Sequence, residues 1–173
     1  MISRLVLVTG GARSGKSRFA EARLGELAPD GPWRYIATAE ALDDEMRARI
    51  MHHRARRGET WRTVEAPRML ADALAASDEA GVLVDCITIW LSNLLLDGGS
   101  DEALLAATDA VAAAARAAAR PVVFVTNEVG AGIVPEHALA RRFRDLAGWV
   151  NQRLASACDE VFLVAAGLPL RLR

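Results

Sequence analysis

Residues 10–17 read GGARSGKS and contain the single lysine of the chain, Lys16, in a sequence that otherwise uses arginine at its basic positions. The spacing is GxxxxGK[ST], in which glycine-rich backbone turns its N–H groups inward toward phosphate oxygens. A compact ammonium enters such a ring of oxygens as a point charge, whereas the flat guanidinium of arginine prefers bidentate partners. The motif therefore predicts a nucleoside triphosphate site, with Lys16 on the β- and γ-phosphates and the Ser17 hydroxyl on a Mg²⁺ ion.

The surroundings of this motif are those that its mechanism requires. The apolar run RLVLVT (residues 4–9) comes before it, and the helix-forming stretch SRFAEARLGEL comes after it. A strand followed by such a loop and a helix N-terminus is typical of a P-loop. A second acid is expected at the end of another buried strand, and the run VLVD supplies Asp85. We therefore predict that Ser17 and Asp85 hold the Mg²⁺ ion.

Two adjacent histidines lie in a strongly basic stretch of an otherwise nearly neutral chain. His52 and His53 are surrounded by five arginines: Arg47, Arg49, Arg54, Arg56 and Arg57. Adjacent helical residues point about 100° apart, so only one imidazole can face a bound nucleotide, and the spacing does not decide which. The stretch is either a solvated basic helix or an anion site whose imidazole attacks a phosphate as a nucleophile.

Short apolar runs alternate with longer helical patterns along the chain. Strands are expected at residues 4–9, 34–38, 81–85, 121–127 and 160–166, and helices at 16–28, 43–57, 67–77, 88–96, 101–119 and 136–157. Continuous apolar strands are typical of strands buried on both faces. The pattern predicts an α/β fold, a P-loop NTPase-like and mostly parallel sheet with helices on both faces.

Composition narrows the class of protein further. The chain has 173 residues, 52% of them hydrophobic, which suits one domain over residues 1–173. A net charge of −1 and 5% aromatic residues argue against nucleic acid as a partner. Cys86 and Cys158 lack metal-ligand spacing and are expected to be buried free thiols. No apolar run approaches the roughly 18 residues of a membrane span, so we expect a cytoplasmic protein.

Several stretches, in order and over nearly the whole chain, resemble one enzyme family. They are TGGARSGKSRFAE, YIATAEALDDEMRARIMHHRARR, WRTVEAP, DCITIWLSNLL, TNEVGAGIVPEHALARRFRDLAGWVNQRLA and CDEVFLVAAGLPL. Together they look like the bifunctional adenosylcobinamide kinase/adenosylcobinamide-phosphate guanylyltransferases of cobalamin biosynthesis. The segment TNEVGAGIVP, followed by RRFRDLAG and NQRLA, is the most specific part of this resemblance.

The resemblance implies two reactions on one corrinoid. ATP or GTP phosphorylates adenosylcobinamide, and GTP then delivers GMP to the resulting phosphate through a guanylylated histidine, which by position is His52. A homo-oligomer, a trimer with the site shared between subunits, is also implied. The implied nucleotide contacts are Gly10, Gly11, Ala12, Arg13, Ser14, Gly15, Lys16, Ser17, Ala37, Thr38, Ala39, His53, Arg54, Ala55, Arg56, Glu65 and Asp85.

The principal alternative from another class is a P-loop ATPase or regulatory module, because this kind of fold supports switching as readily as group transfer. The histidine and arginine stretch separates the two hypotheses, since a switch has no need of a nucleophilic imidazole. No general base for the kinase step stands out in the sequence. Glu128 follows an expected strand end, where it would act as a base or orient the chain.

Overall fold

The computed structural model describes residues 4–40, 58 and 60–173, and these residues form a sheet in the order β3-β2-β4-β5-β1-β6-β7. All neighbouring strands pair in parallel except β6 and β7, which are antiparallel. The strands are β1 (Leu5–Gly10), β2 (Trp33–Ala37), β3 (Trp61–Glu65), β4 (Gly81–Asp85), β5 (Val122–Val125), β6 (Glu160–Ala165) and β7 (Leu168–Arg171).

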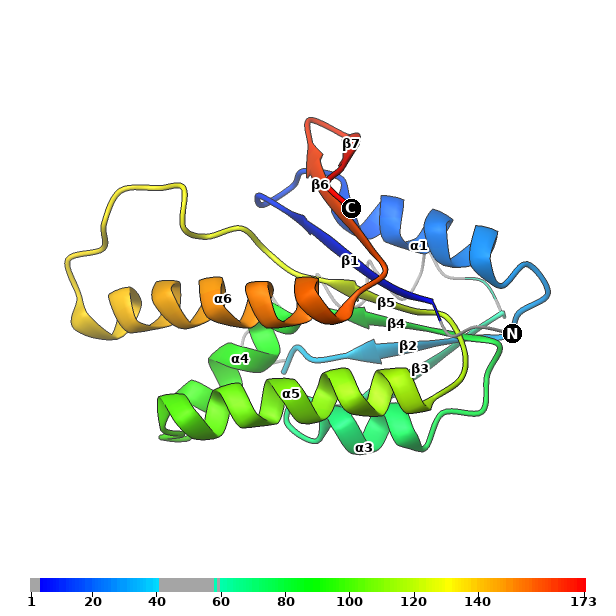
Figure 1. Cartoon of the computed structure of the whole chain (residues 1–173), viewed down its shortest axis with the longest axis horizontal. Coiled ribbons are helices and arrows are strands. Elements are labelled where there is room, and N and C mark those ends of the chain that lie inside the picture. The colour runs from blue at the N-terminus through cyan, green and yellow to red at the C-terminus, as the bar shows by residue number, and fades with distance from the viewer. Residues whose placement is uncertain (1–3, 41–57, 59) are drawn as a thin grey trace.

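Helices cover both faces of the sheet, as the sequence predicts (Figure 1). On one face lies α1 (Lys16–Leu27), which packs on β1, β4 and β5. On the other face lie α3 (Leu70–Ala75), α4 (Ile87–Leu96), α5 (Asp101–Ala117) and α6 (Ala138–Ala157). Successive β5 residues alternate between the two cores, with Phe124 on the side of the four helices and Val125 on the side of α1. The sheet is thus buried on both faces.

Most of the predicted elements are confirmed, with ends that agree or are shifted by up to three residues. Ser100 caps α5, its hydroxyl accepting a hydrogen bond from the Ala103 N–H at 3.2 Å. The predicted helix at 67–77 is shorter, because Pro67 and the turn after it delay the start of α3 to Leu70. The last helix starts at Ala138 rather than 136, since His137 still has extended backbone. The predicted helix at 43–57 lies outside the described residues.

Two edge strands were not predicted from the sequence. β3 (WRTVE) is short and only partly buried, so it lacks the apolar run by which the inner strands were recognised. β7 (LPLR) contains a proline, which edge strands tolerate because one side of their backbone is unpaired. Both strands are defined by pairing with a neighbour rather than by their own residues.

The strand order brings three carboxyl ends together. β5 lies between β1, which leads into the glycine-rich loop, and β4, which ends at Asp85. Ligands of open parallel sheets bind at such carboxyl ends. No helix of the described residues has the length and apolar character needed to cross a bilayer.

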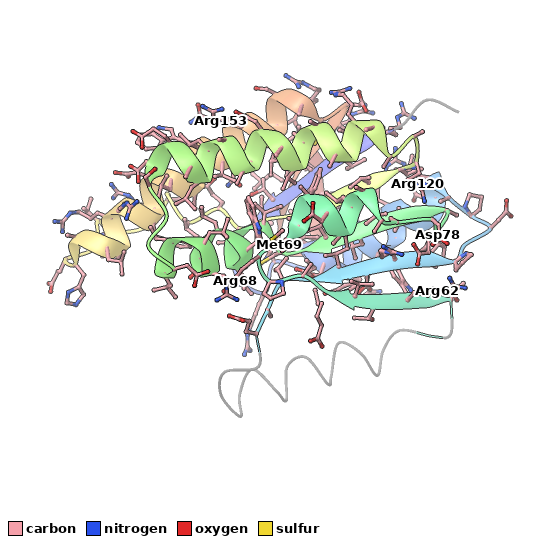
Figure 2. The ribbon with its side chains drawn as sticks, turned by 90° about the horizontal axis from the view of Figure 1, so that it is seen from below. Arg62, Arg68, Met69, Asp78, Arg120 and Arg153 are labelled. Carbon is pink, nitrogen blue, oxygen red and sulfur yellow. The ribbon has the colours of Figure 1, made fainter. Side chains whose placement is uncertain are left out.

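The opposite, amino-terminal edge of the sheet is held by a buried ion pair. The Glu79 side chain is 2% exposed and lies 2.7 Å from Arg34 Nε, and it also accepts a hydrogen bond from the Ser77 hydroxyl. Arg120 donates to the Glu79 carbonyl at 2.8 Å. Figure 2 labels Arg120 and Asp78 at this end of the sheet and Arg68 toward the other end. Burial acts to raise the pKa of the Glu79 carboxyl, but the contacts with Arg34 and Ser77 outweigh it and lower the pKa.

Replacement of Glu79 by glutamine should lower the free energy of unfolding at pH 7 by about 3 kcal/mol, because it leaves Arg34 uncompensated. The folded-state pKa of Glu79 lies below that of the unfolded chain, about 4.3. Its stabilisation is therefore present above that pH and is lost as the pH falls through the folded-state pKa. Urea unfolding from pH 7 to pH 3 measures this: the difference in free energy of unfolding between wild type and Glu79→Gln should shrink as the pH falls.

Asp78→Asn is the matched control, because the Asp78 side chain is 82% exposed and lies 3.6 Å from Arg34. We expect it to change the free energy of unfolding by less than about 0.5 kcal/mol. A Glu79→Gln defect that stayed constant down to pH 3 would contradict the assignment of the stabilisation to the carboxylate.

Candidate active site

The glycine-rich loop joins the end of β1 to the start of α1 through unusual backbone. Gly15 is the N-cap of α1 with a φ of 93°, and Arg13 also has a positive φ, 56°. Such left-handed conformations turn successive N–H groups toward one side, which creates a concave anion site. Lys16 is the first residue of α1, and its Nζ donates to the Gly11 carbonyl at 3.1 Å. The ammonium is thus held over the loop.

The β6–β7 hairpin, which was not predicted from the sequence, contacts the glycine-rich loop. The N–H of Gly167, in the turn between β6 and β7, donates to the Ser14 carbonyl at 2.8 Å. A Cβ placed on Gly15 would lie 3.2 Å from the Gly167 Cα, and one placed on Gly10 would lie 2.4 Å from the Val164 carbonyl oxygen. Close contact with β6 therefore requires glycine at position 10, and the turn after β6 leaves little room for a side chain at position 15. The only feature of the sequence that could have indicated this contact is the segment AAGLPL, in which a glycine precedes the proline-containing strand.

Asp85 ends β4 on the face of the sheet that carries α1. Its Oδ2 accepts a hydrogen bond from the Tyr35 hydroxyl at 3.0 Å. The fully buried Thr38 hydroxyl donates to the Cys86 carbonyl at 2.7 Å and accepts from the Cys86 N–H at 2.8 Å. Asn93 in turn donates to the Thr38 carbonyl at 2.9 Å. Thr38, predicted as a nucleotide contact, therefore uses its hydroxyl to hold the chain after Asp85.

Arg68 is a further organising residue that sequence reasoning missed. It pairs with Glu40 at 2.6 Å and with Asp97 at 2.5 Å. Glu40 is the last described residue before residues 41–57, which include both adjacent histidines. The contact ties the chain after β2 to the C-terminal end of α4. In the sequence, the only indication of this role of Arg68 is its position directly after Pro67.

The oxygen donors of this region suit Mg²⁺. A serine hydroxyl and an aspartate carboxylate are hard ligands, and magnesium proteins commonly add substrate phosphates to one or two such groups. No group of three His, Cys, Asp or Glu side chains capable of binding a metal occurs among the described residues. The oxygen donors of Ser17 and Asp85 therefore fit a Mg²⁺ ion that binds together with nucleotide phosphates.

The structure brings many of the predicted contact residues to one edge of the sheet. The loop residues from Gly10 to Ser17 follow β1, Ala37 ends β2 and Asp85 ends β4. Glu65 ends β3 opposite Ala37, at the far end of the same edge from the loop. The predicted nucleophile His52 and the predicted contacts His53, Arg54, Ala55 and Arg56 lie outside the described residues.

Neither thiol is a nucleophile in this site. Cys86 and Cys158 are free and buried, as predicted. Burial, reinforced by Asp85, raises the pKa of Cys86 to about 11, and burial raises the pKa of Cys158 to about 12. Both thiols are therefore protonated at neutral pH, whereas the thiolate is the reactive form.

A glycine-rich loop between a buried parallel strand and a helix N-terminus, beside an acid at a neighbouring strand end, defines a P-loop nucleotide-binding protein. Comparison with known proteins narrows this class. The chain belongs to the cobinamide kinase/cobinamide phosphate guanyltransferase family, whose model matches residues 6–172.

Three relatives match along nearly their full length. The bifunctional adenosylcobalamin biosynthesis protein CobU of Salmonella typhimurium is 51% identical over 98% of this chain and 99% of its own, and CobU of Escherichia coli is 47% identical with the same coverage. The corresponding CobP of Pseudomonas aeruginosa is 46% identical over 96% of each chain.

Solved structures with little sequence identity share the fold. A KaiC-like protein of Pyrococcus horikoshii has a TM-score of 0.52 at 12% identity, covering 92% of this chain and 70% of its own. The flagellar accessory protein FlaH of Methanocaldococcus jannaschii has a TM-score of 0.51 at 12% identity with the same coverage. They confirm the P-loop NTPase-like fold alone.

Gly10→Ala should disrupt the loop, because its new methyl group would meet the Val164 carbonyl oxygen and the Ser14 Oγ, 2.4 and 2.7 Å away. We expect a loss of about 2–3 kcal/mol in stability, as for other overpacked sites, together with strongly weakened nucleotide binding. Gly11→Ala is the matched control, since nothing lies within 4 Å of its added Cβ. Thermal unfolding and calorimetric titration with ATP measure both effects. Equal behaviour of the two variants would contradict the role of the β6 contact.

Proposed function

We propose that this chain uses one triphosphate site for both reactions of its family. In the first, ATP or GTP phosphorylates adenosylcobinamide, and in the second, GMP passes from GTP through His52 to give adenosylcobinamide-GDP. The proposal is supported by the glycine-rich loop with Lys16, which lies at the same edge of the sheet as Asp85 at the end of β4. The family model, which matches residues 6–172, supports it independently.

The kinase step needs positioning and charge neutralisation more than covalent chemistry. The substrate hydroxyl oxygen forms a bond to the γ-phosphorus while the bond from that phosphorus to the bridging oxygen breaks, and the hydroxyl proton leaves to solvent or a base. Lys16 and the loop N–H groups stabilise the charge that develops on the phosphate oxygens. A Mg²⁺ ion held by Ser17 and Asp85 would supply further neutralisation of this charge.

The guanylyl step needs a nucleophile that the kinase step does not. A neutral nitrogen of His52 would attack the α-phosphorus of GTP, and pyrophosphate would leave. A phosphate oxygen of the phosphorylated corrinoid would then attack the same phosphorus and release the imidazole. The nucleotide contacts proposed for this step include His53, Arg54, Ala55, Arg56 and Glu65, from the family resemblance. The arginines that neighbour His52 in the sequence would favour the neutral, nucleophilic form of its imidazole.

The long segment between β5 and α6 suits an apolar substrate. Figure 1 shows it as the yellow loop that extends away from the sheet. Ile133 is 96% exposed in it and Val134 is also exposed, an arrangement that favours contact with a large apolar ring system. The Glu128 carboxylate accepts a hydrogen bond from the Gly130 N–H at 2.8 Å. This contact supports a role for Glu128 in orienting the loop, rather than as the base.

The assembly and compartment follow from the family resemblance. We propose a cytoplasmic homotrimer in which subunits share the site. Exposed apolar side chains of β7 and the residues after it, Leu168, Leu170 and Leu172, are consistent with a contact between copies.

Lys16→Ala should abolish both reactions, because each depends on a triphosphate held in the same loop and the chain has no other lysine. Loss of one charged donor at a developing oxyanion should cost about 3–4 kcal/mol in transition-state free energy, or about 10²–10³ in rate. Lys16→Arg should also be poor, since the guanidinium is too broad for this position. Product analysis with ATP and GTP measures both steps. Formation of GMP–enzyme at the wild-type rate by Lys16→Ala would contradict a shared site.

His52→Ala should lose guanylyl transfer alone, because only that step passes through an imidazole. Its product should stop at adenosylcobinamide phosphate. Incubation with α-³²P-labelled GTP, followed by alkali and then acid, tests this, since a phosphoramidate keeps its label in alkali and loses it in acid. The wild type should carry such label and His52→Ala should not.

His53→Ala is the matched control and should show a milder defect, because the family resemblance assigns the nucleophile to His52 and only a nucleotide contact to His53. Label on His52→Ala together with no label on His53→Ala would reverse the assignment. An unlabelled wild type that still hydrolyses ATP would instead favour an ATPase module.

A further inference from the structure

The backbone after β5 continues to pair with β1 as far as the glycine-rich loop. The Thr126 N–H donates to the Val8 carbonyl at 3.0 Å, and the Glu128 N–H donates to the Gly10 carbonyl at 3.2 Å. These bonds extend the parallel ladder that joins Val125 to Val8. Residue 127 therefore lies beside the first glycine of the loop, in a segment whose side chains still alternate between faces.

This alternation places Asn127 on the side of the nucleotide loop. Val123 and Val125 lie in the core beneath α1, whereas Phe124 lies in the core of the other face. Thr126 continues on that other face, where its hydroxyl donates to Asn151 of α6 at 2.8 Å. Asn127 then falls on the α1 face, which also carries Asp85 at the end of β4.

A closed ring of hydrogen bonds fixes the backbone of Asn127. Its N–H donates to the Thr88 hydroxyl at 2.7 Å, and its carbonyl accepts from Asn151 Nδ2 at 3.1 Å. The Thr88 and Thr126 hydroxyls are 3.2 Å apart, which completes the ring through Asn151. Both threonines are buried. The side-chain amide of Asn127 takes no part in this ring, and it has no hydrogen-bond partner among the residues that the structure describes.

We propose that Asn127 is a further catalytic residue, whose side-chain NH₂ donates a hydrogen bond to the terminal phosphate of the bound triphosphate. This inference rests on the proposed kinase function. The terminal phosphate of a nucleotide held by Lys16 would come to the carboxyl edge between β1 and β4, where Ser17 and Asp85 would hold a metal ion. That is the place where β5 ends and Asn127 is held. A rigid neutral donor there stabilises charge on the transferred phosphoryl group and exchanges no proton with it.

Calorimetric titration with ADP and with a non-hydrolysable ATP analogue tests the proposal, because the two ligands differ in the terminal phosphate. In Asn127→Ala, the affinity for the ATP analogue should fall about tenfold relative to ADP, whose affinity should stay within about twofold. Asn127→Asp conserves the shape but presents an acceptor with negative charge to the phosphate. Its loss for the ATP analogue should exceed that of Asn127→Ala.

Gln152→Ala is the matched amide control, because Gln152 is an exposed residue of α6 next to Asn151. It should leave both affinities unchanged. Equal weakening of ADP and ATP analogue in Asn127→Ala, no weakening of either, or binding by Asn127→Asp as tight as the wild type would each overturn the role of Asn127. Phosphorylation of adenosylcobinamide is measured on the same wild-type preparation. Its absence would contradict the proposed function itself, separately from the ratio of affinities in the variants.

Discussion

The parallel pairing of β1 with β5 on one side and β6 on the other is the constraint on which the site depends. It brings the Val164 carbonyl so close to Gly10 that no side chain fits there, and it leads the backbone of Glu128 to the Gly10 carbonyl. The loop is thus held from both neighbouring strands before a nucleotide arrives. A site prepared in this way spends little binding energy on ordering its own backbone.

The two ends of the sheet have different tasks. At the amino-terminal edge, buried carboxylates are neutralised by arginines, as Glu79 is by Arg34 and Glu160 is by Arg23. Those charges are internally compensated and stabilise the fold. At the carboxyl edge, the glycine-rich loop, Asp85 and Asn127 lie at the strand ends where open parallel sheets bind their ligands. This separation lets the binding edge keep polar groups for a substrate without loss of a stable sheet.

The same fold occurs in proteins with very different sequences. Structures with 12% identity share the fold, so the arrangement of strands and P-loop is compatible with very different residues elsewhere. In this chain, the features outside that arrangement include the histidine and arginine residues that follow Glu40 in the sequence, and the exposed Ile133 and Val134 between β5 and α6.

The sequence by itself determined the inner strands, the P-loop and the acid at the end of β4, because buried parallel strands need continuous apolar runs and the loop needs glycine, lysine and serine at set spacing. It also carried the family resemblance. Tertiary structure alone decided that β3 and β7 are strands, that Gly167 supports the loop and that Thr38 holds the Cys86 backbone. These features depend on contacts between residues far apart in the chain. The identity of a threonine or a glycine in the sequence does not indicate which distant residues it will contact in the folded protein.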